Sequence, residues 1–249
     1  MNLTIDIGNS NILFCFFSNE SLISKKKLNL HMLSDKIIKD ILKKNKVNIK
    51  TKILVSSVVP NIKVYIINLI QKLGYKVYSL KSLIKVLKIK TNIKDKTTIG
   101  EDRIVNAYYA GILFKKVPII IIDFGTATTL DIIENSGVYD GGIITPGIEL
   151  SLKTLSERTA QLPLVKFSKT KSVIGRNTDE AIKSGFFWGN IAMINGLISK
   201  INKEKRNTSK IILTGGNSKF FKGLIDNVVI NDDLFNAKGL NYIINKFVK

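Results

Sequence analysis

The pattern of apolar and polar positions divides this chain into short strands that alternate with amphipathic helices. Strands are predicted where apolar runs are bounded by turn residues, at positions 3–5, 12–17, 53–59, 76–80, 118–122, 130–133, 139–145 and 210–213. Helices are predicted where apolar residues recur at helical spacing, at 36–44, after 61, 100–113, 146–158, after 178, after 216 and 238–247. This alternation predicts an α/β fold.

Two helix starts carry a polar residue of the kind that caps a helix. Asn61 and Thr178 are the predicted caps, and Asp179 and Glu180 follow Thr178 in the first turn, where the helix dipole favours acids. Residues 88–99 are polar and basic, and we expect a loop there.

A short element occurs twice along the chain. Asp6-Ile7-Gly8-Asn9-Ser10 and Asp123-Phe124-Gly125-Thr126-Ala127 each follow one apolar strand and precede another. This repeat suggests two similar lobes that face a cleft, although chance recurrence of a common turn is an equal alternative.

Composition narrows the chemistry. The 249 residues are 45% hydrophobic with a mean hydropathy of +0.13, which is enough for a packed core. The chain has one cysteine, Cys15, and one histidine, His31, so disulfide frameworks and multi-cysteine zinc sites are excluded. Any proton transfer is therefore expected to involve an Asp or Glu side chain. The longest clean apolar run, residues 117–122, is far shorter than the roughly twenty residues of a membrane span, so we expect a cytoplasmic protein.

The formal charge is +20, from 39 Lys and Arg against 19 Asp and Glu. Residues 25–52 hold ten Lys and two Asp, and residues 81–96 hold six Lys and one Asp. Neither stretch interleaves aromatic residues for base stacking. We therefore expect non-specific affinity for phosphates rather than specific nucleic-acid recognition.

The two Asp-x-Gly turns suit a polyphosphate. The chain has neither the P-loop nor the Rossmann fingerprint. Glycine lets several backbone N–H groups aim at one anion, and an Asp at a strand end can hold a divalent cation beside it. A third turn, Thr214-Gly215-Gly216, would let backbone lie close to a flat purine. Together the three turns indicate a nucleotide cleft.

Asp102 is the candidate catalytic carboxylate. It lies two residues after Gly100, at a predicted helix start, with Arg103 beside it. Taken alone, it is better explained as a helix-start acid that complements the dipole. The functional alternative is a carboxylate that orients a substrate hydroxyl for phosphoryl transfer and accepts its proton late.

The chain resembles the type III pantothenate kinases of bacterial coenzyme A synthesis over nearly its whole length. The resemblance rests on the order of eight segments: DIGNSN (6–11), GEDR with NA (100–103 and 106–107), DFGTATT (123–129), GGIITPG (141–147), TAQLP (159–163), IGRNT (174–178), SG (184–185) and TGG (214–216).

The resemblance implies the fold of the actin/hexokinase/Hsp70-type ATPases, an α/β fold with duplicated ribonuclease-H-like lobes, mixed sheets flanked by helices and a nucleotide cleft. The lobes are expected at residues 1–116 and 117–249, with the closing helix able to pack back on the first. The implied reaction converts ATP and pantothenate into ADP and 4′-phosphopantothenate. The alternative is a nucleotide-binding accessory protein of the same fold without kinase activity.

The resemblance also implies roles for individual residues. Asp102 would accept the proton, Asp6 would face Mg²⁺ directly or through water, and Asp123 would help bind K⁺ or NH₄⁺. The ATP-binding residues would be Asp6, Ile7, Gly8, Asn9, Ser10, Asn11, Ile12, Leu13 and Thr126, and the pantothenate-binding residues would be Gly100, Glu101, Asp102, Arg103 and Thr178. The family works as a homodimer. Gly185 and Gly189 would allow close helix approach, or are simply tolerated glycines.

Three residues depart from the family's pattern. Glu101 replaces a small apolar residue, and Ile93 and Lys96 stand where a Tyr and a Pro are usual. We expect Glu101 to point outward, because an inward carboxylate beside Asp102 would raise one of the two pKa values.

Overall fold

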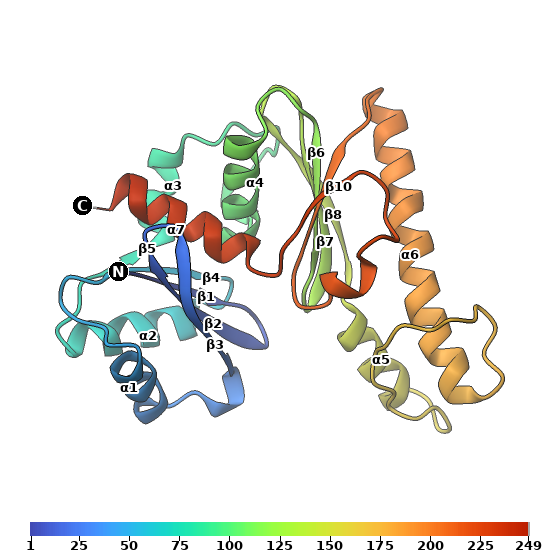
Figure 1. Ribbon diagram of the computed structural model, residues 1–249, viewed down its shortest axis with the longest axis horizontal. Coiled ribbons are helices and arrows are strands. Elements are labelled where there is room, and N and C mark those ends of the chain that lie inside the picture. The colour runs from blue at the N-terminus through green and yellow to red at the C-terminus, as the bar shows by residue number, and fades with distance from the viewer. Residues whose placement is uncertain (249) are drawn as a thin grey trace. The chain divides into compact units, whose positions relative to one another are not determined.

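The computed structural model describes residues 1–248, which fall into two compact units (Figure 1). Unit 1 comprises residues 1–90 and 94–113 together with the last helix, α7 (Phe235–Phe247). Unit 2 comprises residues 91–93 and 114–234. Each unit is built around one five-stranded mixed sheet.

The sheet of unit 1 has the order β3-β2-β1-β4-β5. Its strands are β1 (Asn2–Ile7), β2 (Asn11–Ser18), β3 (Ser21–Asn29), β4 (Lys52–Ser57) and β5 (Val77–Ser79). The first three strands pair antiparallel, and β4 and β5 run parallel to β1. Its helices are α1 (Asp35–Lys44), α2 (Pro60–Lys72), α3 (Leu80–Leu87), α4 (Glu101–Leu113) and α7.

Helices cover both faces of this sheet (Figure 1). Side chains alternate between faces along a strand, so Ile53 and Val55 of β4 pack in the core with α1 and α2, while Leu54 packs with α3, α4 and α7. The odd-numbered residues of β1, such as Ile5, face α1 and α2. Asp6 therefore lies on the opposite face, the one that α3, α4 and α7 cover.

The sheet of unit 2 has the order β10-β9-β6-β7-β8. Its strands are β6 (Ile119–Phe124), β7 (Ala127–Ile133), β8 (Tyr139–Pro146), β9 (Lys210–Thr214) and β10 (Val228–Asn231), and its helices are α5 (Ile148–Glu157) and α6 (Thr178–Lys205). The apolar face of α6 packs on β6 and β9. The ring of Phe124 stacks on that of Phe221, with 4.3 Å between centroids.

The two sheets have one topology. Strands β6 to β10 of unit 2 correspond in order to strands β1 to β5 of unit 1. In each unit the first three strands form an antiparallel meander. The fourth strand pairs parallel with the first, and the fifth strand pairs parallel with the fourth. The two Asp-x-Gly turns occupy equivalent hairpins, β1–β2 and β6–β7. This arrangement confirms the expected α/β class with duplicated lobes.

Several elements escaped the sequence prediction. Strand β3 carries the lysines 25–27, which resemble a solvated charge run, yet it is an edge strand, and lysine is common on protected edges. Helix α3 and strand β10 were also not predicted, and α7 begins at Phe235 rather than at 238. The turn at 214–216 leads only to a short 3-10 helix, Ser218–Phe221.

Both predicted caps are wrong by one or two positions. Helix α2 starts at Pro60, whose fixed φ suits the first helical position, and its N-cap residue Val59 makes no side-chain cap bond. The cap of α6 is Asn177, whose side chain accepts from the Glu180 N–H at 2.9 Å, and Thr178 is the first helical residue.

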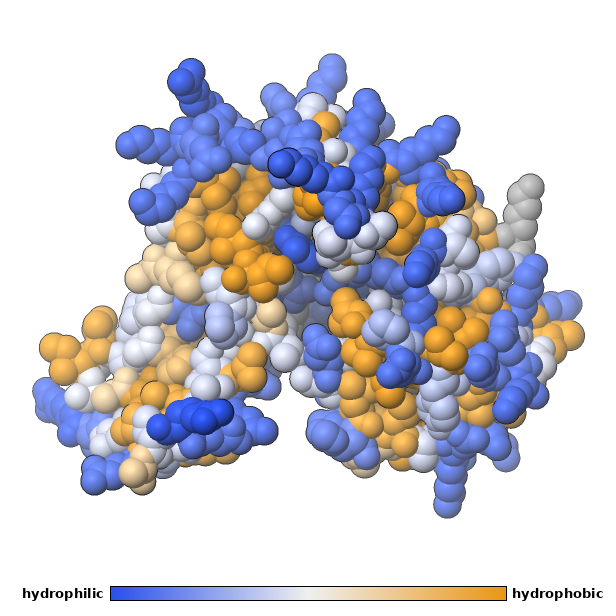
Figure 2. Space-filling view, turned by 180° about the vertical axis from the view of Figure 1, so that it is seen from behind, coloured by the Kyte–Doolittle hydropathy of each residue, from blue (hydrophilic) through white to orange (hydrophobic). Residues whose placement is uncertain are grey.

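The positive charge is concentrated in unit 1. Residues 1–90, 94–113 and 235–249 contain 23 Lys and Arg against 7 Asp and Glu, whereas the rest of the chain contains 16 against 12. Hydrophilic side chains cover much of the face drawn in Figure 2. Among residues 1–248, no helix has the length and apolar character needed to span a membrane.

Candidate functional site

The β1–β2 turn is an open hairpin. Ile7 pairs with Ile12, and the Gly8 N–H donates to the Asn11 carbonyl at 3.0 Å. Asn9 and Ser10 form the exposed tip, and the Ser10 carbonyl accepts from the Leu30 N–H at 3.1 Å. The predicted phosphate segment, residues 6–13, thus comprises this tip and the adjoining ends of the two strands.

Asp6 stands beside a polar position of β4. Its register partner there is Ser56, whose buried Oγ has no hydrogen-bond partner within residues 1–248. By alternation both side chains lie on the sheet face that carries α4. This face therefore presents a carboxylate and a hydroxyl together at the carboxyl ends of two parallel strands.

Two glycines from other loops closely approach the β6–β7 turn, whose tip residues Gly125 and Thr126 are exposed. The Gly147 N–H donates to the Thr126 carbonyl at 3.0 Å, and a Cβ at Gly147 would collide with the carbonyl oxygens of Gly125 and Thr126. Gly215 has φ +85°, and a Cβ there would lie 2.6 Å from the Phe124 nitrogen and collide with the Asp123 carboxylate. At Gly215 the 214–216 turn thus packs closely on the β6–β7 turn, and a Cβ at Gly216 would meet no atom within 4 Å among the described residues.

Asp102 lies in the first turn of α4. Its Oδ1 accepts from the Arg103 N–H at 2.8 Å, and a Cβ at Gly100 would lie only 2.5 Å from that oxygen. Asn236 of α7 donates to the Asp102 carbonyl at 3.0 Å and to Asn106 Oδ1 at 3.2 Å, which ties α7 to the start of α4. A side chain at position 100 would therefore require this carboxylate to shift.

Burial raises the pKa of the Asp102 carboxyl above its ordinary value. The Arg103 N–H and the Arg103 charge oppose part of this rise. A carboxyl with a raised pKa is better matched to proton transfer near neutral pH than an ordinary aspartate. Asp102 therefore has the environment of a proton acceptor in addition to its place at a helix start.

The expectation that Glu101 points outward is wrong. Its Oε2 accepts from the Ser57 N–H at 3.0 Å, and its Oε1 pairs with Lys63 Nζ at 2.5 Å. Both side chains are only 12% exposed. The inward orientation is stabilised because Lys63 of α2 supplies a counter-charge and Ser57, at the end of β4, supplies a backbone donor.

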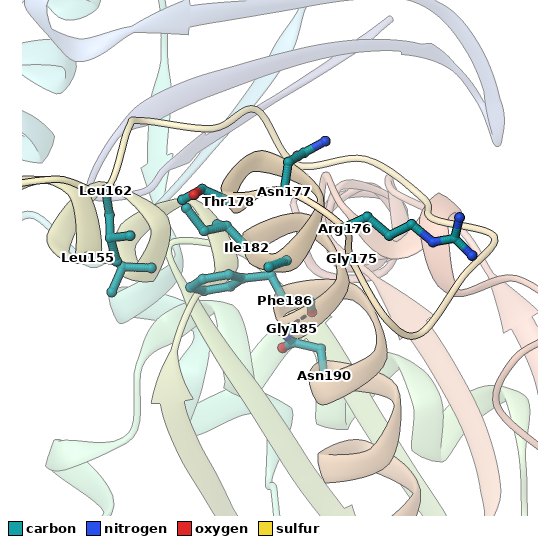
Figure 3. A pocket seen from close by; sticks show the side chains of 11 residues that line it. Leu155, Leu162, Gly175, Arg176, Asn177, Thr178, Ile182, Gly185, Phe186 and Asn190 are labelled. Atoms are coloured by element: carbon teal, nitrogen blue, oxygen red, sulfur yellow. Dashed lines mark hydrogen bonds between the residues drawn. The ribbon is translucent and has the colours of Figure 1, made fainter.

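Thr178 lies at the rim of a cavity of about 680 Å³ in unit 2. The apolar lining comes from Leu155, Leu162, Ile182 and Phe186, and polar groups come from the α6 start and from Asn190. Figure 3 shows Thr178, Ile182 and Phe186 projecting toward the two leucines. This volume and mixed lining are typical of small-molecule sites.

Sequence reasoning assigned no binding role to most of this cavity. Segments 159–163 and 174–178 were part of the resemblance, but only Thr178 was given a ligand. The signal that could have identified the cavity from the sequence was the short distance along the chain between these segments and Thr178. Ile93 and Lys96, the other two positions at which a departure was expected, are not among the residues that line this cavity.

The carboxylates that were expected to bind cations are not part of a larger cluster of ligating side chains. Among residues 1–248, no group of three or more His, Cys, Asp or Glu side chains is placed to hold a metal. Mg²⁺ commonly uses one or two carboxylates together with water and substrate phosphates, so Asp6 fits such a site when a nucleotide is bound. At Asp123, the absence of a Cβ from Gly215 keeps room beside the carboxylate.

Comparison with known proteins gives consistent results. The family model of type III pantothenate kinase matches residues 2–200. The chain is 39% identical over 246 residues to a type III pantothenate kinase of Pelagibacter ubique, covering 94% of this chain and 95% of the relative. It is 38% identical over 239 residues to one of Persephonella marina, covering 92% of each.

A solved structure shares the fold. Component A of the Acidaminococcus fermentans (R)-2-hydroxyglutaryl-CoA dehydratase aligns with a TM-score of 0.56 at 14% identity, covering 100% of this chain and 99% of that one. This likeness concerns the fold alone. It agrees with the two sheets of one topology described above.

Proposed function

This chain belongs to the type III pantothenate kinase family, and we propose that it transfers the γ-phosphoryl group of ATP to pantothenate, yielding ADP and 4′-phosphopantothenate. The observation that links this function to a particular residue is the buried Asp102 carboxyl at the start of α4, whose pKa is raised. An accessory protein that only binds nucleotide has no use for such a group. The reaction is expected in the cytoplasm, where ATP is abundant.

Asp102 accepts the proton of the attacking pantothenate hydroxyl. In phosphoryl transfer the transition state is loose, so the carboxylate chiefly orients the hydroxyl and takes its proton late. Arg103, the next residue, offers a positive charge to the carboxylate of pantothenate. Gly100 leaves the space that the Asp102 carboxylate occupies, and Thr178 supplies a hydroxyl at the cavity on α6.

The two hairpin turns bind the nucleotide. The backbone N–H groups of residues 6–13 and the Thr126 hydroxyl contact its phosphates. Asp6 holds Mg²⁺ directly or through water, and Asp123 helps to hold K⁺ or NH₄⁺. When bound, these cations neutralise negative charge on the phosphates.

The protein works as a homodimer that uses α6. On this helix, a Cβ added at Gly185 or Gly189 meets no atom within 4 Å among the described residues. A second copy can therefore approach the backbone closely at these two positions. Light scattering should give about twice the mass of one chain, and introducing Trp at position 189 (Gly189→Trp) should shift the mass toward the monomer.

A coupled assay tests the proposed reaction. The purified chain is supplied with ATP, Mg²⁺ and K⁺, and ADP release is recorded with and without pantothenate, while mass spectrometry detects the phosphorylated product. We expect ADP release that depends on pantothenate and weakens when Na⁺ replaces K⁺. Nucleotide binding by calorimetry without any phosphopantothenate would instead support an accessory protein.

A further inference from the structure

An ion pair lies directly beside the proposed proton acceptor. Glu101 precedes Asp102 in the chain, and its carboxylate binds Lys63 of α2 and the Ser57 N–H of β4. Both partners are largely buried, which makes the contact costly to break from one side.

The same contact reaches the first phosphate turn through the backbone. Ser57 is the register partner of Ile7, and the Val58 N–H donates to the Ile7 carbonyl at 3.1 Å. Glu101 therefore connects the start of α4 to the strand end from which the turn 8–11 leaves. The two N–H groups that make these links belong to consecutive residues, Ser57 and Val58.

The segment between β4 and α2 is itself fixed. Ser57 Oγ donates to the Val59 carbonyl at 3.0 Å and accepts from the Val59 N–H at 2.9 Å. Pro60 then starts α2, and a Cβ at Gly100 would lie 3.6 Å from a methyl group of Val58. Because the Glu101 carboxylate is bound to this fixed segment, the start of α4 has little freedom to move away from it.

We propose that the Glu101–Lys63 pair is a positioning device that holds Asp102 at a fixed distance and direction from the β1–β2 turn. Lys63 and Glu101 are then positioning residues of the proposed kinase reaction, on which this inference rests. Lys63 also compensates the second negative charge that Glu101 brings next to Asp102. Small displacements of a reacting group are sufficient to lower a rate strongly, by up to about 10²-fold for about 1 Å.

Four variants test the proposal in the full-length protein. Lys63→Met removes the counter-charge, Lys63→Arg keeps it, and Glu101→Gln keeps an acceptor for the Ser57 N–H but breaks the ion pair. Lys153→Met is the matched control, because Lys153 pairs with Glu157 at 3.6 Å on the exposed surface of α5. For each variant, kcat, the KM values for ATP and pantothenate, and the melting temperature are measured.

We expect Lys63→Met and Glu101→Gln to lower kcat by about tenfold or more, with the KM for ATP changed less than about twofold. Lys63→Arg should recover most of the rate, and Lys153→Met should match the wild type. A merely structural pair would lower the melting temperature and leave kcat of the folded fraction unchanged, which would overturn the proposal.

The outcomes separate this inference from the proposed function. If the wild type makes no phosphopantothenate, the proposed function fails and the inference fails with it. If the wild type is active and both charge-removing variants keep its kcat, only the inference fails. If Lys63→Met does not fold, Glu101→Gln still decides, since it retains the Ser57 bond.

Discussion

The two hairpin turns occupy the same position in two sheets of the same topology, yet they are supported differently. Asp6 and Asp123 each stand near the end of the first strand, beside Ser56 and Thr214 of the parallel neighbour. The β6–β7 turn is packed by two glycines from other loops, whereas a Cβ at Gly8 in the β1–β2 turn would make only an ordinary contact of 3.4 Å. The tips of both turns are exposed, so the two turns differ in how closely glycines of other loops approach their backbone.

This comparison separates the features that both units share from those that only one unit has. The hairpin and its acidic residue occur in both units, because the strand order fixes where they lie. Only unit 1 adds a buried acid at a helix start, Asp102, and unit 1 also carries most of the net positive charge. We infer that the β6–β7 turn, which other loops hold closely, serves as a rigid binding surface, while unit 1 carries the proton transfer.

The largest effect is expected from Asp102→Asn, which removes the group that has no counterpart in unit 2. General base catalysis contributes about 10²–10⁴-fold, so kcat should fall by that factor. ATP binding, measured by calorimetry, should be retained. A variant with the wild-type rate would remove Asp102 from the mechanism and leave the two units alike in chemistry.

The next largest effect distinguishes the β6–β7 turn from the β1–β2 turn. Gly215→Ala combines a positive φ with a collision against Phe124 and Asp123, and it should destabilise the protein by about 2–4 kcal/mol in denaturant unfolding. Gly216→Ala, next in the chain with open space around it, and Gly8→Ala should each stay within about 1 kcal/mol. Equal losses at positions 8 and 215 would show that the two turns are supported alike.

The two aspartates should differ in the cation that they serve. Asp6→Asn should raise the Mg²⁺ concentration needed for half-maximal activity by about tenfold, with little change in the K⁺ requirement. Asp123→Asn should do the reverse. Titrating each variant with both cations checks this, and a shared response would mean that the turns do not divide the cations between them.

The smallest effect concerns stability and follows from the raised pKa of Asp102. Because the folded state favours the protonated carboxyl, folding loses stability as the pH rises from the ordinary Asp value of about 3.9 through the raised folded pKa. At neutral pH the charged carboxylate therefore destabilises the fold. Asp102→Asn should raise the melting temperature at pH 7 by a few degrees, roughly 2–4 °C per kcal/mol, whereas a decrease would contradict the burial argument.

Local patterns were sufficient to predict most of the fold. Apolar runs and their turn residues gave the hairpins, and the repeated Asp-x-Gly turns suggested the duplication that the sheets display. Strand β3 escaped because lysines on an edge strand resemble a charged loop. The caps were misplaced because Pro60 already starts α2 directly before Asn61, and because Asn177, directly before Thr178, accepts the capping hydrogen bond of α6.

The candidate site was predictable only in part. Sequence order and resemblance identified Asp102, but they gave no sign that its neighbour Glu101 turns inward. That contact depends on Lys63, which lies on a different helix, and no local periodicity links the two. The burial that raises the pKa of Asp102 is likewise a property of packing between α4 and its surroundings.

The most direct measurement is a crystal structure of the protein with pantothenate and a non-hydrolysable ATP analogue bound. The account predicts an Asp102 carboxylate oxygen at hydrogen-bond distance, about 2.6–3.2 Å, from the hydroxyl that receives the phosphoryl group. A pantothenate hydroxyl bound elsewhere, with Asp102 contacting neither it nor the γ-phosphate, would contradict the account.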